Sequence, residues 1–159
     1  FFRGTPLVVQ LLVGYYILLP LMSIHLSPVM ACVAIFGLNS GAYISEIMRG
    51  GINSVDAGQL EAARAVGLPF STSMLKVVVP QAIKNILPAL GNEFIMMIKE
   101  TSLASTFYIN ELMKTRIVLQ STYFLTWQPL FVIAIIYYVL TSLLSKAVSL
   151  LERRLAVSD

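Results

Sequence analysis

The sequence predicts an all-α, polytopic membrane protein, a bundle of helices that crosses a lipid bilayer several times. Of its 159 residues, 57% are hydrophobic and only 12% are charged, and the mean hydropathy is +0.81, which is unlike a water-soluble domain. From Gly4 to Ser45 there is no Asp, Glu, Lys or Arg. That length suits two helices of about 20 residues, each crossing about 30 Å of hydrocarbon. With two later hydrophobic runs, we expect four spans.

The first two expected spans are separated by a short turn. The first runs from Leu7 to Ile24 and closes at His25–Pro28, where His25 is interpreted as an ordinary interface residue. The second runs from Val29 to about Met48 and is rich in small residues, which favour close helix packing in lipid. The single cysteine, Cys32, cannot form an internal disulfide, and we interpret it as a packing residue.

A polar stretch from Arg49 to Val79 is expected to lie outside the hydrocarbon, because charged residues and glycines arrive together there. Asp56 can cap a helix, Gln59 can answer back to that cap, and Gly67, with a proline close behind it, can end the helix. The sequence therefore predicts a helix from Ala57 to Val66.

The third expected span, from about Pro80 to Ile98, is the least apolar and is interrupted by Pro88. Polar groups at membrane depth are tolerated only where they face protein or water. A polar interlude follows from Lys99 to Thr126. Within it, residues 105–120 are predicted to form an amphipathic surface helix.

The last expected span runs from Trp127, an aromatic residue suited to the membrane interface, to Leu151 and a charged tail. The net charge of +3 is scattered along the chain. We therefore interpret the basic residues as topology signals, and we expect no nucleic-acid partner. Seven Lys and Arg lie in or beside the central loop and in the C-terminal tail, whereas three lie in the polar stretch from Lys99 to Thr126. The positive-inside rule thus predicts that the loop and the C-terminus are cytoplasmic.

The central loop carries a motif that narrows the function. Glu61-Ala62-Ala63 is followed after three residues by Gly67 and, nine residues later, by Val77 and the pair Val79-Pro80. This pattern resembles the Glu-Ala-Ala loop of ABC-importer permease subunits, with Val79 where leucine is commoner.

The resemblance continues over nearly the whole chain and is to the branch that imports polar amino acids such as histidine, arginine, glutamine or glutamate. The further matching stretches are Arg3-Gly4-Thr5-Pro6, Gln10, Ala42-Tyr43, Glu46, Arg49-Gly50-Gly51-Ile52, Gly58-Gln59, Asn92-Glu93-Phe94 and Lys99-Glu100-Thr101-Ser102-Leu103. It implies the type I importer permease fold, one transmembrane domain over residues 1–159 with a coupling loop at about 49–79, and the cytoplasmic (inner) membrane of a bacterium.

In that family Arg3 falls inside a span. We therefore expect natural sequence, with at least one earlier span, before Phe1. For Arg3 itself we favour a structural kink over direct contact with substrate.

The resemblance also implies partners. There is no Gly-x-x-x-x-Gly-Lys-Ser/Thr motif, so ATP and Mg are expected to be used by a separate ATP-binding cassette ATPase dimer, while this chain is not an enzyme and binds no cofactor. The other expected partners are a second permease subunit, identical or homologous, an extracytoplasmic amino acid binding protein, and membrane lipid. Glu61, Ala62, Ala63 and Gly67 form the expected coupling site. Small residues allow close approach to the motor, and glycine allows the turn back to the membrane.

Polar residues in the third span are candidates for the substrate path. Asn92 and Glu93 are expected to face this path, because burying a charged carboxylate in a membrane span is costly unless it faces protein or water. The Glu93 carboxylate could receive a substrate amine or cationic side chain. Backbone amides and hydroxyls at Thr101–Ser102 could receive the substrate carboxylate. Alternatively, Glu93 pairs with Lys84 or Lys99 and holds helices in register.

Asn39, Tyr43 and Glu46 share one helix face by their i, i+4, i+7 spacing. This face could line the path, with Tyr43 as a candidate contact. The interpretation we favour is that Asn39 and Tyr43 make interhelical hydrogen bonds and that Glu46 lies at the cytoplasmic boundary near Arg49. Met96–Met97 is interpreted as packing.

Three other functions compete with this prediction. The chain could be a permease for another small solute, or a secondary transporter that needs no ATP, against which the Glu61 to Pro80 pattern argues. An intramembrane enzyme would need Glu46 and Glu93 as an acid–base pair. The sequence shows no nucleophile with a matched base and no His/Cys metal spacing to support such an enzyme.

Overall fold

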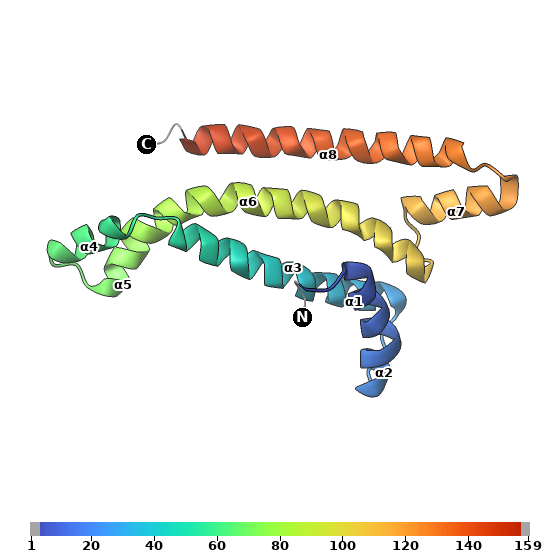
Figure 1. Ribbon diagram of the computed structural model, residues 1–159, viewed down its shortest axis with the longest axis horizontal. Helices are drawn as coiled ribbons and strands as arrows, with labels where there is room; N and C mark the ends of the chain where they lie inside the picture. Colours follow the sequence, from blue (N-terminus) through green and yellow to red (C-terminus); the bar gives the residue numbers. More distant parts are fainter. Residues whose placement is uncertain (1–3, 157–159) are drawn as a thin grey trace. The chain divides into compact units, whose positions relative to one another are not determined.

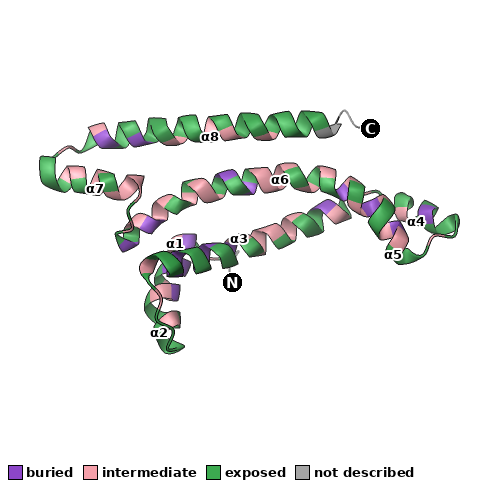
Figure 2. Cartoon of the chain, turned by 180° about the vertical axis from the view of Figure 1, so that it is seen from behind, coloured by how far each residue is buried: buried purple, intermediate pink, exposed green. Residues whose placement is uncertain are grey.

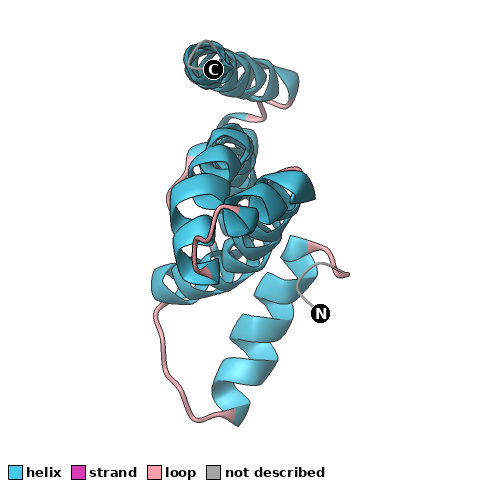
Figure 3. Cartoon of the chain, turned by 90° about the vertical axis from the view of Figure 1, so that its left-hand side faces the viewer, coloured by secondary structure: helices cyan, strands magenta, loops and turns pink. Residues whose placement is uncertain are grey.

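The computed structural model describes residues 4–156, and every regular element in that range is a helix (Figures 1 and 3). Arg3, for which a kink was expected, lies outside it. The described chain divides into two compact units. Unit 1 contains residues 4–42 and Ile95–Leu144, and unit 2 contains Tyr43–Phe94 and residues 145–156.

The N-terminal helix is continuous from residue 7 to residue 21, three residues shorter than predicted. It consists of α1 (Leu7–Val13), the π-helical segment η1 (Gly14–Leu18) and α2 (Leu19–Leu21). Within it the Leu19 N–H donates to the Gly14 carbonyl, five residues back. The wide turn stands directly before Pro20, which lacks an N–H and would crowd the carbonyl four residues earlier in a regular α-helix.

Helix α3 (Pro28–Asn53) is longer than the second predicted span. It continues five residues past Met48, so Arg49, Gly50 and Gly51 are helical and not part of a loop. Gly51 is buried in this extension and packs closely on α6, where a Cβ would collide with the Ile86 side chain.

A second long helix runs without a break from residue 70 to residue 100. Its parts are α5 (Phe70–Ser73), the π-helical segment η2 (Met74–Val78) and α6 (Val79–Glu100). The π-helical turn again stands just before a proline, Pro80, and the Val79 N–H donates to the Met74 carbonyl. The expected interruption at Pro88 is not seen, since α6 continues through it.

The prediction of a surface helix over residues 105–120 is wrong about where that helix begins. Residues of the 3₁₀-helix η3 (Thr101–Phe107) continue α6, and Tyr108 then takes a left-handed conformation with φ +55° that ends it. Helix α7 (Leu112–Tyr123) begins later because the Glu111 carboxylate accepts from the N–H groups of Met113 at 2.7 Å and Lys114 at 2.5 Å. Helix α8 (Trp127–Ala156) follows.

Unit 1 packs around an apolar cluster from the N-terminal helix, the first half of α3 and η3. Its buried members are Leu7, Leu11, Cys32, Ile35, Phe36, Ala104 and Phe107. Cys32 is 4% exposed, which confirms its packing role. Tyr15 meets Phe107 edge-on with ring centroids 5.1 Å apart, and Met97 packs against the cluster. Lipid tails are as apolar as these side chains, so in a membrane close packing stabilises such a cluster more than water exclusion does.

Unit 2 is built on close approaches at small residues. Beside Gly51, the Asn85 amide of α6 donates to Ser54 Oγ at 2.8 Å, and Ser54 Oγ donates to the Gly51 carbonyl at 2.7 Å. Farther along α6, a Cβ on Gly91 would lie 2.7 Å from Val148 of α8. Such contacts are typical of helices that pack in lipid.

Two described helices have the length and apolarity of a membrane span, Pro28–Asn53 and Trp127–Arg154. Residues 7–21 are apolar but shorter. Helix α6, expected as the third span, does not meet the same test, because lysine, asparagine and glutamate interrupt its apolar residues. Figure 2 shows that the residues of α8 are mostly exposed, and only 6% of its apolar window is buried within the chain. So large an exposed apolar surface indicates contact with lipid or with another protein.

Candidate functional site

The predicted loop helix forms, as α4 (Ala57–Ala65) in unit 2. The Asp56 carboxylate caps it by accepting from the Gly58 N–H at 2.6 Å, as the sequence indicated. The Gln59 side chain does not return to this cap. Its oxygen accepts from the Gln81 amide of α6 at 3.4 Å, which links α4 to the helix that follows it.

Gly67 ends α4 in a Schellman motif. Its φ is +92°, its N–H donates to the Arg64 carbonyl at 3.0 Å, and the Leu68 N–H donates to the Ala63 carbonyl at 3.2 Å. Pro69 follows as the N-cap of α5. The turn that the sequence predicted at Gly67 is therefore confirmed, and it reverses the chain within a few residues.

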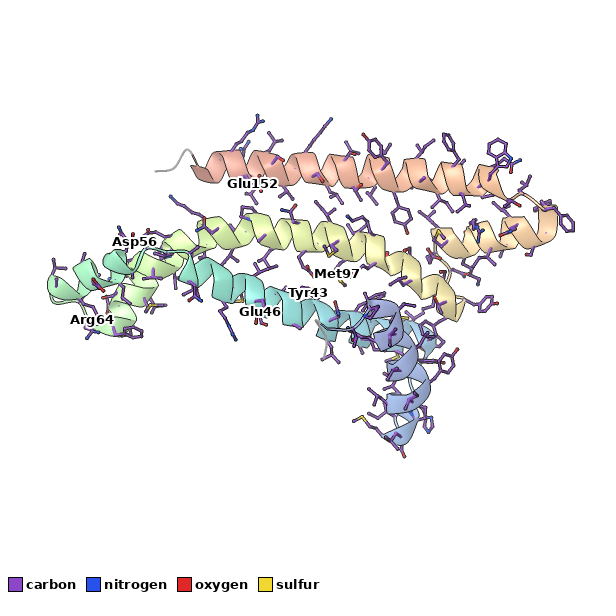
Figure 4. The ribbon with its side chains drawn as sticks, viewed as in Figure 1. Tyr43, Glu46, Asp56, Arg64, Met97 and Glu152 are labelled. Atoms are coloured by element: carbon purple, nitrogen blue, oxygen red, sulfur yellow. The ribbon has the colours of Figure 1, made fainter. Side chains whose placement is uncertain are left out.

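The motif residues occupy different faces of α4. Ala63 is 7% exposed and packs inward, whereas Glu61, Ala62 and Gly67 are exposed. Figure 4 places Asp56 and Arg64 near the two ends of this short helix. The arrangement offers a partner a small surface of alanine backbone with one carboxylate, Glu61, beside it.

Hydrophobic side chains also project from the turn and from α5. Val66 is 79% exposed and Phe70 is 57% exposed. We name the segment from Asp56 to Ser73 the elbow. Large exposed apolar residues on a polar loop indicate a protein contact surface.

The elbow is joined firmly to α6. Ser73 is fully buried, and its hydroxyl donates to the Pro69 carbonyl at 3.1 Å and to that of Leu68 at 3.4 Å. η2 and α6 then continue the helix that α5 begins, so the elbow leads directly into α6.

The candidate path residues in unit 2 are Tyr43, Asn92 and Glu93. Glu93 is 9% exposed and lies inside the unit, while its neighbour Asn92 is exposed, since successive helical residues point about 100° apart. Tyr43 is half-buried on α3. Glu46 is 3.8 Å from Arg49, as expected, with the Arg49 side chain 71% exposed and the Glu46 side chain 37% exposed.

Thr101 and Ser102 belong to unit 1 and do not form an open anion nest. The Thr101 hydroxyl donates to the Ile98 carbonyl at 2.6 Å and the Ser102 hydroxyl to the Lys99 carbonyl at 2.7 Å. Their backbone continues α6 as η3, so no free helix N-terminus arises there. A substrate carboxylate would have to displace these hydroxyl contacts.

A buried polar network in unit 1 gives Asn39 the interhelical role that we favoured. Its amide donates to Gln10 Oε1 of α1 at 2.9 Å, and Gln10 Nε2 donates to the Thr5 carbonyl at 2.9 Å and hydroxyl at 3.1 Å. Asn39 and Gln10 are each 3% exposed. The sequence pointed to Asn39 but not to its partner, because the pairing joins residues 29 apart.

The described residues contain no group of three or more His, Cys, Asp or Glu placed to hold a metal ion. His25 lies exposed in the turn after α2.

Comparison with known proteins gives consistent matches. Residues 1–157 match the family described as binding-protein-dependent transport system inner membrane component. A Rickettsia bellii protein, provisionally named glutamine transport system permease protein GlnP, is 43% identical over 157 residues, covering 99% of this chain and 72% of its own. The arginine transport system permease protein ArtQ of Bacillus subtilis is 39% identical over 158 residues, with the same coverage.

A solved structure matches as well. It is a crystal structure of an amino acid ABC transporter with histidines, 46% identical in sequence, with a TM-score of 0.90 over 96% of this chain and 71% of that one.

Proposed function

The chain belongs to the family of binding-protein-dependent transport system inner membrane components, and we propose that its elbow transmits the motion of a separate ATPase to amino acid import. It is a permease subunit of an amino acid ABC transporter and is not itself an enzyme. The similar proteins are named for glutamine and arginine transport, and one solved structure holds histidines. These names support polar amino acids as the cargo.

One observation carries the coupling proposal. Helix α4 is capped at Asp56, is ended by Gly67, and exposes Glu61 and Ala62 on a body that continues into α6. A short rigid helix of this kind suits a cleft on a motor, because closure of the cleft then moves the attached membrane helix.

The partners follow from the same function. We propose an ATP-binding cassette ATPase dimer that uses ATP and Mg, a second permease subunit, identical or homologous, and an extracytoplasmic amino acid binding protein. This chain holds no cofactor in the proposal. It lies as a multi-pass protein in the cytoplasmic membrane of a bacterium, with α4 and the C-terminus on the cytoplasmic side, in agreement with the excess of Lys and Arg there.

For the substrate path we propose Glu93 as the main polar contact, with Tyr43 and Asn92, which belong to the same unit, as further members. The burial of Glu93 supports this role, since a carboxylate at membrane depth is costly without one. Thr101 and Ser102 are secondary members of the path, because their hydroxyls are already engaged with carbonyls.

The test is uptake into proteoliposomes that hold the permease, the ATPase and the binding protein. We expect accumulation of a polar amino acid only when ATP and Mg are inside with the motor. Uptake at the same rate without ATP would overturn the proposal in favour of a secondary transporter.

A further inference from the structure

A groove between α7 and the first part of α8 lies within unit 1. Its volume is about 300 Å³ and its accessible lining is entirely apolar. Leu119 lies on the α7 side, and Val132, Ile133 and Ile136 lie on the α8 side. Arg116 and Gln128 also line it, and since no polar atom faces the groove they contribute carbon atoms alone.

Two polar atoms behind this lining have no hydrogen-bond partner among the described residues. They are Nε of Arg116 on α7 and Oε1 of Gln128 on α8, both buried. Buried polar atoms are nearly always satisfied, so such atoms call for a missing partner. Of the Arg116 side-chain nitrogens, only Nε is both buried and unpartnered, and the residue as a whole stays partly accessible.

Arg116 is the cationic residue in the lining of the groove. Lys114 lies two residues before it but outside the lining, and its ammonium donates to Asn110 at 2.7 Å. Glu111, on the same segment, directs its carboxylate to the first N–H groups of α7. Among the described residues no carboxylate forms an ion pair with Arg116.

We expect the groove to lie near a membrane interface. Exposed aromatic side chains surround the link from α7 to α8, with Tyr123 64%, Phe124 87% and Trp127 70% exposed. Aromatic residues gather where hydrocarbon meets lipid headgroups. An apolar groove that opens beside a cation at this depth matches an amphiphile with one chain and one negative group.

We propose that this groove binds an anionic phospholipid, with an acyl chain between α7 and α8 and its phosphate at Arg116. A guanidinium suits a phosphate because it can donate two parallel hydrogen bonds. The lipid would complete the packing of α7 on α8. The inference needs a membrane around the chain, but it does not depend on which solute is carried.

Photo-crosslinking tests the site in the assembled transporter, reconstituted in vesicles. One preparation contains phosphatidylglycerol with a diazirine in the acyl chain, and the other contains phosphatidylcholine with the same labelled chain. Adducts are mapped by mass spectrometry. We expect the anionic probe to label residues 112–136 about tenfold more than the neutral probe, as the loss of one charge-assisted bond would predict.

Matched variants locate the two parts of the lipid. Arg116→Gln should reduce labelling by the anionic probe about tenfold, while Lys114→Gln should leave it unchanged. Ile136→Trp, at a groove position that is 40% exposed, should remove labelling, whereas Ile135→Trp, 47% exposed and outside the lining, should not.

Equal labelling by both probes, or labelling that is indifferent to Arg116→Gln, would overturn the proposal. Crosslinks from the groove to the second permease subunit would do the same and identify protein as the occupant. Amino acid uptake is measured in the same vesicles. If the vesicles take up no amino acid but the anionic probe still labels the groove selectively, the transport proposal fails and the lipid site is retained.

Discussion

Gly67 takes a backbone conformation that glycine adopts at little cost and other residues do not. Its φ of +92° lets the chain satisfy two carbonyls of α4 while turning back towards α5. No atom lies within 4 Å of the position where a Cβ would stand, so space is not what excludes a side chain. The requirement is conformational.

Replacing Gly67 with alanine should therefore lower stability by about 1–2 kcal/mol, through backbone strain alone. Gly50→Ala is the matched control, because Gly50 also has open space around it but is helical. There alanine should be neutral or stabilise by about 0.5–1 kcal/mol. Thermal unfolding of the purified transporter measures both, and equal shifts for the two variants would refute the conformational explanation.

Glu93 differs from its neighbour Asn92 in burial, and the difference matters for specificity. Glu93→Gln should change the preference between cationic and neutral amino acids, because it removes the negative charge from the proposed path. Glu152→Gln, at an exposed carboxylate near the end of α8 (Figure 4), serves as control. Uptake of arginine and glutamine is compared, and an unchanged ratio for Glu93→Gln would assign this residue a structural role.

At the scale of elements, α4 has one face that packs inside unit 2 and one face that is exposed. Ala63 packs inward at 7% exposure, and Ala62 points outward. The small size of Ala63 is explained by close packing within the unit. For Ala62 packing gives no reason, and we propose that its small size lets the motor come close.

A tryptophan should separate these causes. Ala63→Trp should destabilise the protein by about 1–3 kcal/mol through overpacking. Ala62→Trp should leave unfolding unchanged and reduce ATP-driven uptake at least about tenfold, the loss expected when about 1.4 kcal/mol of docking free energy disappears. Ser121→Trp, exposed on α7, controls for added bulk. Normal uptake by Ala62→Trp would show that this face is not a docking surface.

Local signals predicted some elements well and failed at others for identifiable reasons. Asp56 and Gly67 act within a few residues of themselves, so the ends of α4 were predictable. The extended end of α3 packs at Gly51 against Ile86, which lies on another helix, and such a contact is not visible in the local sequence. The start of α7 depends on a cap at Glu111 and on a left-handed Tyr108, a conformation that sequence rarely reveals for a residue other than glycine.

At the scale of the whole molecule, composition was sufficient for the class of protein and insufficient for its contacts. The run without charges up to Ser45 and the apolar α8 predicted membrane helices, and the family match agrees. Which polar residues are buried could not be predicted, because periodicity within α6 does not reveal what packs on it. Glu93 and Asn92 illustrate this, as does the Asn39–Gln10 pair.

The proposed topology can be tested through the side of the membrane on which α7 lies. In the proposal α4 is cytoplasmic and both α3 and the helix from residue 70 to residue 100 cross the membrane, which places α7 on the extracytoplasmic side. In a Cys32→Ala background, a membrane-impermeant thiol reagent added to intact cells should label Ser121→Cys and not Arg64→Cys. In lysed cells the reagent should label both cysteines. Labelling of Arg64→Cys in intact cells would reverse the orientation.

The central claim is that the free face of α4 touches a separate ATPase. Crosslinking from a single cysteine at Ala62 measures this most directly, using a short bifunctional reagent on membranes that contain the assembled transporter, with Ser121→Cys as the control position. The account predicts a covalent product between the permease and the ATPase from position 62, with a yield that changes when ATP is added, and none from position 121. Absence of that product from position 62, while the assembled transporter still imports amino acids, would contradict it.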